Sequence, residues 1–420
     1  MTRLTALPTL SSGAASADRS GAELPPRLRP HARLGVLDVT KYFGTTSGGI
    51  KTYLLEKARF VAVRPELRQI MVVPGPADRV DTRNGSRIYA LRGPRIPANP
   101  PYRFLLATRS FRRIVEHERP DVIEVGSPFL VPWLSRLANR RHEAPMVWYY
   151  HTNVPRLVGP EFGLARTRGL ATAALERYVR FLGRRFPGVI CASDYAAAEL
   201  HGCGVERVVR VPLGVDTITF HPRRREWASE TRAVHGLPDG PLAIYAGRFA
   251  AEKRLDVVLD AWAEVERRSR MRLALVGAGP DEARLRAHPY AARVTWLPYQ
   301  RERDRLADLL AAADVAVAPG PSETFGLAVL ESLASGTPVL SVDAGGAGEL
   351  AFRSRAGERY RDGDVGHLAQ AAVWLARQNL PFLGERARRY AEAEHSWDAV
   401  FAALFEVYRG VTSGSWPEPR

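Results

Sequence analysis

Short apolar runs alternate with amphipathic stretches along the first half of the chain. The runs are bounded by Gly, Pro and polar residues, as is typical of buried β-strands. They cover residues 34–39, 70–73, 122–125, 146–150, 189–192 and 208–211. Two of the segments between them, 102–117 and 167–186, have the apolar spacing of helices. Strands that alternate with helices predict a parallel sheet.

The alternation pauses after residue 211 and restarts at residue 242. Between them, residues 221–240 are polar and carry Pro, Arg and Trp, which favours a connection between two domains. Further apolar runs cover 242–246, 272–276, 294–297, 315–318 and 338–342, with a helix predicted over 255–269. Residues 397–409 repeat apolar side chains at helical spacing, so one face of that helix must be buried.

Two domains also follow from the length, because 420 residues exceed what one core usually supports. The predicted parts are a disordered leader (1–30), a first Rossmann-like domain (31–215), a linker (216–240), a second Rossmann-like domain (241–394), and a last helix with a tail (395–420). Apolar residues make up 45% and charged residues 25% of the chain, as in globular proteins. The leader has no apolar run that would serve as a signal peptide or a membrane span.

Cysteine usage and net charge narrow the function classes only in part. The two cysteines, Cys191 and Cys203, give no disulfide framework and no zinc motif, which fits a reducing cytoplasm. The net charge of +15 would attract nucleic acid, an anionic membrane or a phosphorylated ligand alike. Only four of the 60 basic residues are lysines, and Lys253 is the only lysine after position 57. We therefore expect a specific role for Lys253.

Two glycine-containing loops follow predicted strands and precede predicted helices. The first is 44–50, in which the adjacent Gly48 and Gly49 would let the backbone approach a phosphate, although a tight turn explains them equally well. The second is 245–254, in which Gly247 precedes Arg248 and Lys253. Two cations near a helix N-terminus suit a diphosphate, because they would neutralise it as it leaves.

A third loop carries two carboxylates eight residues apart. Glu323 precedes a predicted helix and Glu331 lies about two turns into it, roughly 12 Å further along the axis. Two carboxyls so far apart do not form an acid/base pair. They suit the hydroxyl groups of two separate parts of one elongated ligand, and capping of the helix by Glu323 is the structural alternative.

Together these motifs resemble the large retaining family 4 of glycosyltransferases, which have the GT-B fold. The resemblance runs from Leu34 to Arg409 and is carried by the loop at Gly48 and Gly49 and by the motif from Glu323 to Glu331. It is also carried by the segments 211–216, 247–253, 276–280 and 333–339. Leu213 is a departure, because such enzymes often have Asn there, and we expect it to change local turn hydrogen bonds.

The resemblance implies a role for each motif. Arg248 and Lys253 would bind the donor pyrophosphate with Gly49, Glu331 the ribose, and Glu323 the transferred hexose. Backbone amides would come from Phe325, Gly326 and Leu327, and the base would lie near Leu297, Pro298 and Tyr299. The stretch from His151 to Pro155 resembles that of mannosyltransferases and sulfoquinovosyl-lipid synthases, which implies contact between His151 and the sugar. It further implies two parallel sheets that face a cleft, a last helix that crosses back to the first domain, transfer with retention, and no metal or cofactor.

The expected activity is transfer of a hexosyl group, with mannosyl as the first choice, from a GDP- or UDP-sugar to a lipid or glycan acceptor. One alternative is a sugar-nucleotide epimerase of the same architecture, which needs no acceptor. A nucleic-acid-binding protein is the other, but the sequence has no recognisable module and no aromatic residues interleaved with a basic patch. Residues 164–186 mix apolar residues with Arg, so they suit either a helix packed on the sheet or peripheral contact with an anionic membrane.

Overall fold

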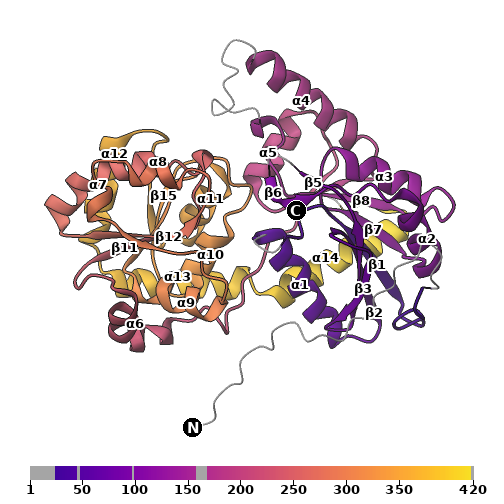
Figure 1. The fold of residues 1–420 in the computed structure, drawn as a ribbon, viewed down its shortest axis with the longest axis horizontal. Helices are drawn as coiled ribbons and strands as arrows, with labels where there is room; N and C mark the ends of the chain where they lie inside the picture. The colour runs from indigo at the N-terminus through magenta and orange to yellow at the C-terminus, as the bar shows by residue number, and fades with distance from the viewer. Residues whose placement is uncertain (1–23, 45–47, 97–98, 158–167, 418–420) are drawn as a thin grey trace, which may run out of the picture.

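The protein contains two β-sheets, each covered by helices, and neighbouring strands are parallel except at one edge of the first sheet (Figure 1). The computed structural model describes residues 24–44, 48–96, 99–157 and 168–417. The predicted leader up to residue 23 and part of the segment 164–186 therefore lie outside the described residues. Two sheets within one chain confirm the predicted fold class.

The first sheet has eight strands in the order β10-β9-β8-β7-β1-β2-β4-β3. Its strands are β1 (Leu34–Val39), β2 (Leu67–Gly75), β3 (Arg79–Arg83), β4 (Ser86–Arg92), β7 (Val122–Val125), β8 (Met146–Tyr150), β9 (Val189–Cys191) and β10 (Val208–Arg210). Its helices are α1 (Gly49–Ala62), α2 (Thr108–Glu118), α3 (Leu130–Asn139), α4 (Arg168–Gly183) and α5 (Asp194–Gly202), with the short η1 (Pro155–Leu157). A separate pair is formed by β5 (Arg95–Ile96) and β6 (Asn99–Arg103).

The second sheet has six parallel strands in the order β13-β12-β11-β14-β15-β16. Its strands are β11 (Leu242–Arg248), β12 (Arg272–Ala278), β13 (Thr295–Leu297), β14 (Val315–Ala318), β15 (Val339–Val342) and β16 (Gly357–Tyr360). The α-helices are α6 (Ala228–His235), α7 (Leu255–Ser269), α8 (Glu282–Arg286), α9 (Arg303–Ala312), α10 (Leu327–Ala334), α11 (Gly345–Ser354), α12 (Val365–Ala376), α13 (Leu380–Glu394) and α14 (Trp397–Thr412). The short 3-10 helices are η3 (Pro222–Trp227), η4 (Ala251–Lys253) and η5 (Ala291–Arg293).

Two expectations from the apolar pattern were wrong. The first sheet is not entirely parallel, because β3 and β4 form an antiparallel hairpin around Asn84 and Gly85. Both turn residues have positive φ, 48° and 70°, as the common two-residue hairpin turn requires. The helix predicted over 102–117 begins only at Thr108, because β6 includes residues 102 and 103 and an irregular segment follows over 104–107.

Helix α14 lies against the first sheet although it follows the second in sequence (Figure 1). The rings of Phe401 and Phe405 pack 5.5 and 5.6 Å from the ring of Phe60 in α1. The chain therefore passes between the sheets twice, and the two passages pair where the Val215 backbone bridges that of Ser396. This confirms the predicted return of the last helix.

The two passages are joined by His395 and Leu213. The Nδ1 of His395 donates to the Leu213 carbonyl at 3.0 Å, and the Leu213 side chain is buried. A Cβ at Gly214 would lie 2.6 Å from the Trp397 ring, so the backbone approaches the indole too closely for a side chain. The residues around Leu213 thus serve the junction between the two halves of the molecule.

The predicted linker, 216–240, contains η3 and α6, which pack against α9. Arg224 forms ion pairs with Asp304 and Asp308, and Arg232 forms one with Asp314. These contacts attach the segment to the second sheet. Within the described residues, no helix is long and apolar enough to cross a bilayer.

Candidate functional site

Loops at the carboxyl ends of strands from both sheets meet around Thr324. Its hydroxyl donates to the carbonyl of His151 at 3.0 Å, and its carbonyl accepts from the hydroxyl of Ser193 at 2.6 Å. His151 follows β8 and Ser193 follows β9, whereas Thr324 precedes α10. In open α/β sheets this is the edge at which ligands bind.

The two predicted cations lie at the end of β11 and in η4. Arg248 is exposed and forms an ion pair with Glu252. A Cβ at Gly247 would lie 2.6 Å from the hydroxyl of Tyr245, which donates to the Arg248 carbonyl at 2.9 Å. Glycine at position 247 thus leaves room for the bond that fixes the backbone of Arg248.

Lys253 forms an ion pair with Glu323, so the fold joins residues from two of the three predicted motifs. Both side chains remain partly exposed. A lysine has three donor hydrogens and a carboxylate accepts several bonds, so each group can still bind a ligand.

The loop that carries Glu323 is held by close backbone contacts. The backbone carbonyl of Glu323 accepts a hydrogen bond from the Gly346 amide at 2.7 Å. Gly326 has a φ of +97°, and a Cβ there would lie 3.0 Å from Ala347. Gly326 directly precedes α10, and no described side chain caps the helix, which leaves its first amides, from Leu327 onward, open to an anion. Phe325 is buried, with its ring against His395.

Glu331 lies about one turn into α10 rather than the predicted two, because the helix begins only at Leu327. It is buried and forms an ion pair with Arg303 at 3.3 Å. Burial raises the pKa of Glu331, while Arg303 opposes that rise. Glu323 and Glu331 therefore have different cationic partners and do not form an acid/base pair.

His151 lies in a buried aromatic setting. Its ring stacks on Tyr149 at 4.0 Å and lies 5.4 Å from Tyr53. Burial lowers the pKa of His151 to about 4, so the imidazole is neutral at pH 7. Its Nε2 is buried and has no hydrogen-bond partner among the described residues.

The predicted glycine loop of the first half faces the second half. A Cβ at Gly49 would lie 3.8 Å from Leu327, so the N-terminus of α1 is close to that of α10. Gly48 precedes α1, and no described side chain caps this helix. The remaining loop residues, 45–47, lie outside the described residues.

The segment predicted to lie near the base follows the edge strand β13. Leu297 ends this strand, Pro298 and Tyr299 follow it, and Tyr299 is 43% exposed. Strand β12 separates them from β11 and Arg248. The segment thus lies at the carboxyl end of the same sheet as Arg248, two strands away.

A buried polar cluster behind His151 was not predicted from the sequence. The ammonium of Lys57 lies 2.6 Å from Asp38 and 3.2 Å from Glu124, and it donates to the Tyr408 hydroxyl at 2.8 Å. Tyr408 in turn donates to Glu124. The available signals were a rare lysine and single acidic residues within two apolar strands.

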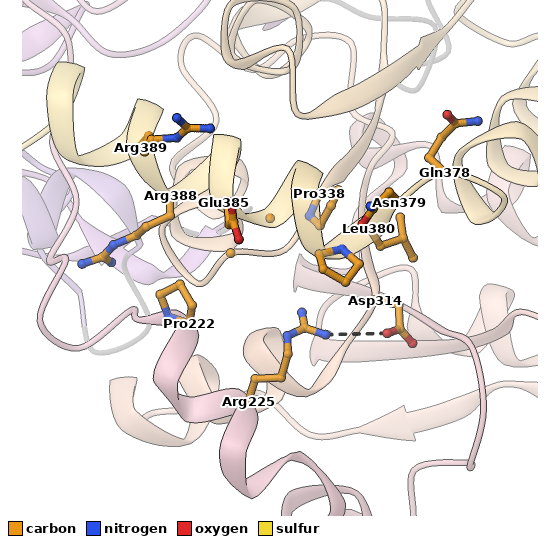
Figure 2. Close-up of a pocket in the computed structure, with 13 residues that line it drawn as sticks. Pro222, Arg225, Asp314, Pro338, Gln378, Asn379, Leu380, Glu385, Arg388 and Arg389 are labelled. Atoms are coloured by element: carbon orange, nitrogen blue, oxygen red, sulfur yellow. Dashed lines mark ion pairs between the residues drawn. The ribbon is translucent and has the colours of Figure 1, made fainter.

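Two cavities occur in the structure, one remote from these residues and one that borders them. One of about 720 Å³ is at the opposite end of the second sheet, between η3 and α13, where Arg225 and Asp314 form an ion pair (Figure 2). The other, about 1120 Å³, lies between the halves and is lined by residues of α11 and by Ser193, Phe325 and His395. No group of three His, Cys, Asp or Glu side chains suited to a metal ion occurs in the described part of the chain.

Models of two protein families match the chain. Residues 47–218 match "Glycosyltransferase Family 4" and residues 240–378 match "Glycosyl transferases group 1". Solved structures share the fold, at identities that support the fold alone. Sucrose-phosphate synthase of Thermosynechococcus elongatus has a TM-score of 0.72 at 20% identity, with 91% of this chain and 100% of that one covered. HepE of Anabaena in complex with UDP-glucose has a TM-score of 0.69 at 17% identity, with 90% and 100% covered.

Curated relatives are similar over most of their length. A GDP-mannose-dependent alpha-(1-6)-phosphatidylinositol dimannoside mannosyltransferase of Mycobacterium tuberculosis is 34% identical, over 73% of this chain and 78% of the relative. A D-inositol 3-phosphate glycosyltransferase of Xylanimonas cellulosilytica is 30% identical, over 87% and 92%. Sulfoquinovosyl transferase SQD2 of Arabidopsis thaliana is 28% identical, over 67% and 55%. The chain therefore belongs to the family 4, group 1 glycosyltransferases.

Proposed function

We propose that this glycosyltransferase moves a hexosyl group, with retention and without a metal or cofactor, from a nucleotide-diphosphate sugar to a lipid or glycan acceptor. Mannosyl from a GDP donor is the first choice, since a relative at 34% identity is described as GDP-mannose-dependent. The observation that carries the proposal is the convergence of Lys253, Glu323 and two helix N-termini that no described side chain caps, at one edge between the sheets.

In the proposed site the donor diphosphate lies between the two halves. Arg248 and Lys253 bind the diphosphate from one side with their positive charge. The backbone amides after Gly48 bind it from the other side with N–H groups that have no partner within the helix. As the bond to the sugar breaks, negative charge grows on the diphosphate, and these groups stabilise it most at that point. The leaving phosphate then takes the proton of the attacking hydroxyl on the same face of the sugar.

The carboxylates and His151 orient the donor. Glu331, held by Arg303, accepts hydrogen bonds from the ribose, and Glu323 accepts them from the hexose. Neutral His151 exchanges a hydrogen bond with a sugar hydroxyl through its unpartnered Nε2. The amides of Phe325, Gly326 and Leu327 serve the same donor, and the base lies near Leu297, Pro298 and Tyr299.

Activity is tested by nuclear magnetic resonance of nucleotide sugars, alone and with candidate acceptors. We expect an α-linked donor to give an α-linked product and to remain unchanged without acceptor. Epimerisation of the donor alone would favour the epimerase instead. Glu323→Ala and Lys253→Ala abolish transfer in this proposal, whereas Glu264→Ala, at a partly exposed residue of α7, leaves it intact. Full activity in both site variants would refute the assignment.

We also propose a cytoplasmic protein that contacts anionic membranes through α4. This helix exposes Leu170 (79%) and Phe181 (46%), and the guanidinium of Arg185 lies over the Phe181 ring. Exposed apolar residues beside arginines suit an anionic lipid surface. Flotation with vesicles should depend on anionic lipid and weaken in Phe181→Ser; flotation that ignores lipid charge would contradict this.

A further inference from the structure

Lys41, two residues after β1, is a partly buried cation with no carboxylate partner among the described residues. The ammonium groups of the other three lysines have oxygen partners: two carboxylates for Lys57, Glu323 for Lys253, and the Gly44 carbonyl at 3.1 Å for Lys51. No such partner of the Lys41 ammonium occurs among the described residues. Burial also lowers the pKa of Lys41. An ammonium that is partly removed from water and unpaired gains strongly from an anion.

Two aromatic rings flank this ammonium. It lies 4.9 Å from the centre of the Tyr42 ring and 5.8 Å from that of Phe129. Tyr42 packs edge-to-face on Tyr102, and Phe129 stacks on Tyr178. Aromatic faces beside a cation suit a ligand that combines an anionic group with the C–H face of a sugar or polyol ring.

The position of Phe129 is maintained against backbone strain. Its φ of +67° is rare for a bulky residue and is unfavourable for its backbone. The hydroxyl of Tyr178 donates a hydrogen bond to the Phe129 carbonyl at 3.2 Å, and the rings of the two residues stack. These two contacts hold the strained Phe129 in place. Such strain is typical of ligand sites.

The loop that carries Lys41 lies close to His151, because a Cβ at Gly126 would lie 3.5 Å from Thr40 and 3.6 Å from the His151 ring. The Lys41 amide donates to the Ser127 hydroxyl at 3.0 Å, which connects the loops after β1 and β7. Tyr42 lies close to Thr152, the neighbour of His151. A ligand here would therefore meet the transferred sugar from the first half of the molecule, as an acceptor must.

We infer that Lys41 binds a phosphate ester carried by the acceptor, and that the rings of Tyr42 and Phe129 contact the acceptor ring. The inference rests on the proposed function and specifies its acceptor. A soluble polyol phosphate and a phospholipid headgroup share this chemistry, so the test must separate them.

Calorimetric titration of the full chain separates these cases with three probes: myo-inositol monophosphate, uncharged myo-inositol, and vesicles with or without phosphatidylinositol. If the ligand is soluble, we expect the monophosphate to bind at least tenfold more tightly than uncharged myo-inositol, because a charged hydrogen bond contributes about that much. If the ligand is a lipid, we expect the same preference only for vesicles with phosphatidylinositol over vesicles without it. Lys41→Met should remove this preference. Lys51→Met, which deletes a neighbouring lysine already bonded to a carbonyl, should retain it within about twofold.

Equal affinity for the charged and uncharged probes in the wild type, or an unchanged preference in Lys41→Met, would overturn the inference. Titration with GDP and UDP in the same variants tests the donor site separately. Nucleotide binding that persists in Lys41→Met shows that the fold and donor site are intact, whereas its absence in the wild type counts against the proposed function itself.

Discussion

Replacing Lys57 by Met tests the buried cluster that connects the last helix to the loop of His151. Lys57 and its partners Asp38 and Glu124 are almost completely buried. The variant would leave two carboxyl groups in the core without a cation, and Tyr408 without one of its two partners. Removing one partner of a buried ion pair costs about 3–5 kcal/mol. For a domain of this size, that lowers the melting temperature by on the order of 10 °C.

The loss should depend on pH. Burial raises the pKa of Asp38 to about 7, while Lys57 opposes the rise. Burial also acts to raise the pKa of Glu124, but the charge of Lys57 and hydrogen bonds from Tyr408 and Tyr53 hold it below its usual range. Without Lys57, the two carboxyl groups must bind protons before they can be buried in the folded protein. Lys57→Met should therefore be much less stable than the wild type at pH 8 and closer to it in stability at pH 5.5.

Asp38→Asn is the matched variant, because it leaves one cation beside one carboxylate. An acid whose pKa is raised in the folded state stabilises the fold below its unfolded pKa, near 4, and loses that contribution as pH rises through 7. Asp38→Asn should therefore flatten the fall in melting temperature between pH 5 and 8. Scanning calorimetry at several pH values measures both variants, with Lys51→Met as a control at the protein surface. A Lys57→Met protein that matches the control at pH 8, or loses the same amount at pH 5.5 and 8, would refute the reasoning.

Three further predictions concern the site and the junction. Thr324→Val loses the hydrogen bond to the His151 carbonyl, which contributes about 1 kcal/mol. The value of kcat/KM should therefore fall about fivefold while the melting temperature stays unchanged. Unaltered kinetics would contradict a role for this contact. In Gly49→Ala the added Cβ would lie 3.8 Å from Leu327, so the variant should fold with unchanged stability and bind nucleotide with a higher Kd. In Gly277→Ala the added Cβ would lie 1.9 Å from the Gly247 carbonyl, so the melting temperature should fall. The reverse pattern would contradict a contact between Gly49 and the nucleotide. Burial lowers the pKa of His395 to about 4, so its stabilisation is complete above pH 6.5 and is lost as pH falls through 4; His395→Gln should reduce the fall in melting temperature between pH 6.5 and 4.5, and an equal fall would contradict this.

The fold followed closely from the sequence because parallel sheets bury both faces of their central strands. Runs such as 34–39 and 122–125 therefore stand out without any knowledge of their neighbours. The hairpin of β3 and β4 was not predicted, although Asn84 and Gly85 form a typical turn. The reason is that β3, the edge strand, is exposed and mostly polar. Its residues lack the apolar pattern on which the prediction relied.

The site was predictable in its parts but not in its pairings. Glu323 and Glu331 could be separated by their spacing, yet only the fold pairs the first with Lys253 and the second with Arg303. The cluster of Lys57 was hidden for the same reason, since Tyr408 and Lys57 are 351 positions apart in the sequence. Contacts over such separations depend on how the last helix returns, which local patterns do not determine.

Calorimetric titration with GDP, UDP and ADP tests the donor site most directly, in the wild type and in Lys253→Ala. Our account predicts that at least one nucleoside diphosphate binds the wild type and that its Kd rises at least tenfold in the variant, because Lys253 would contact the diphosphate. Absence of binding by all three nucleotides, or equal affinity in the two proteins, would contradict the assignment of Lys253 and Glu323 to a nucleotide-sugar site.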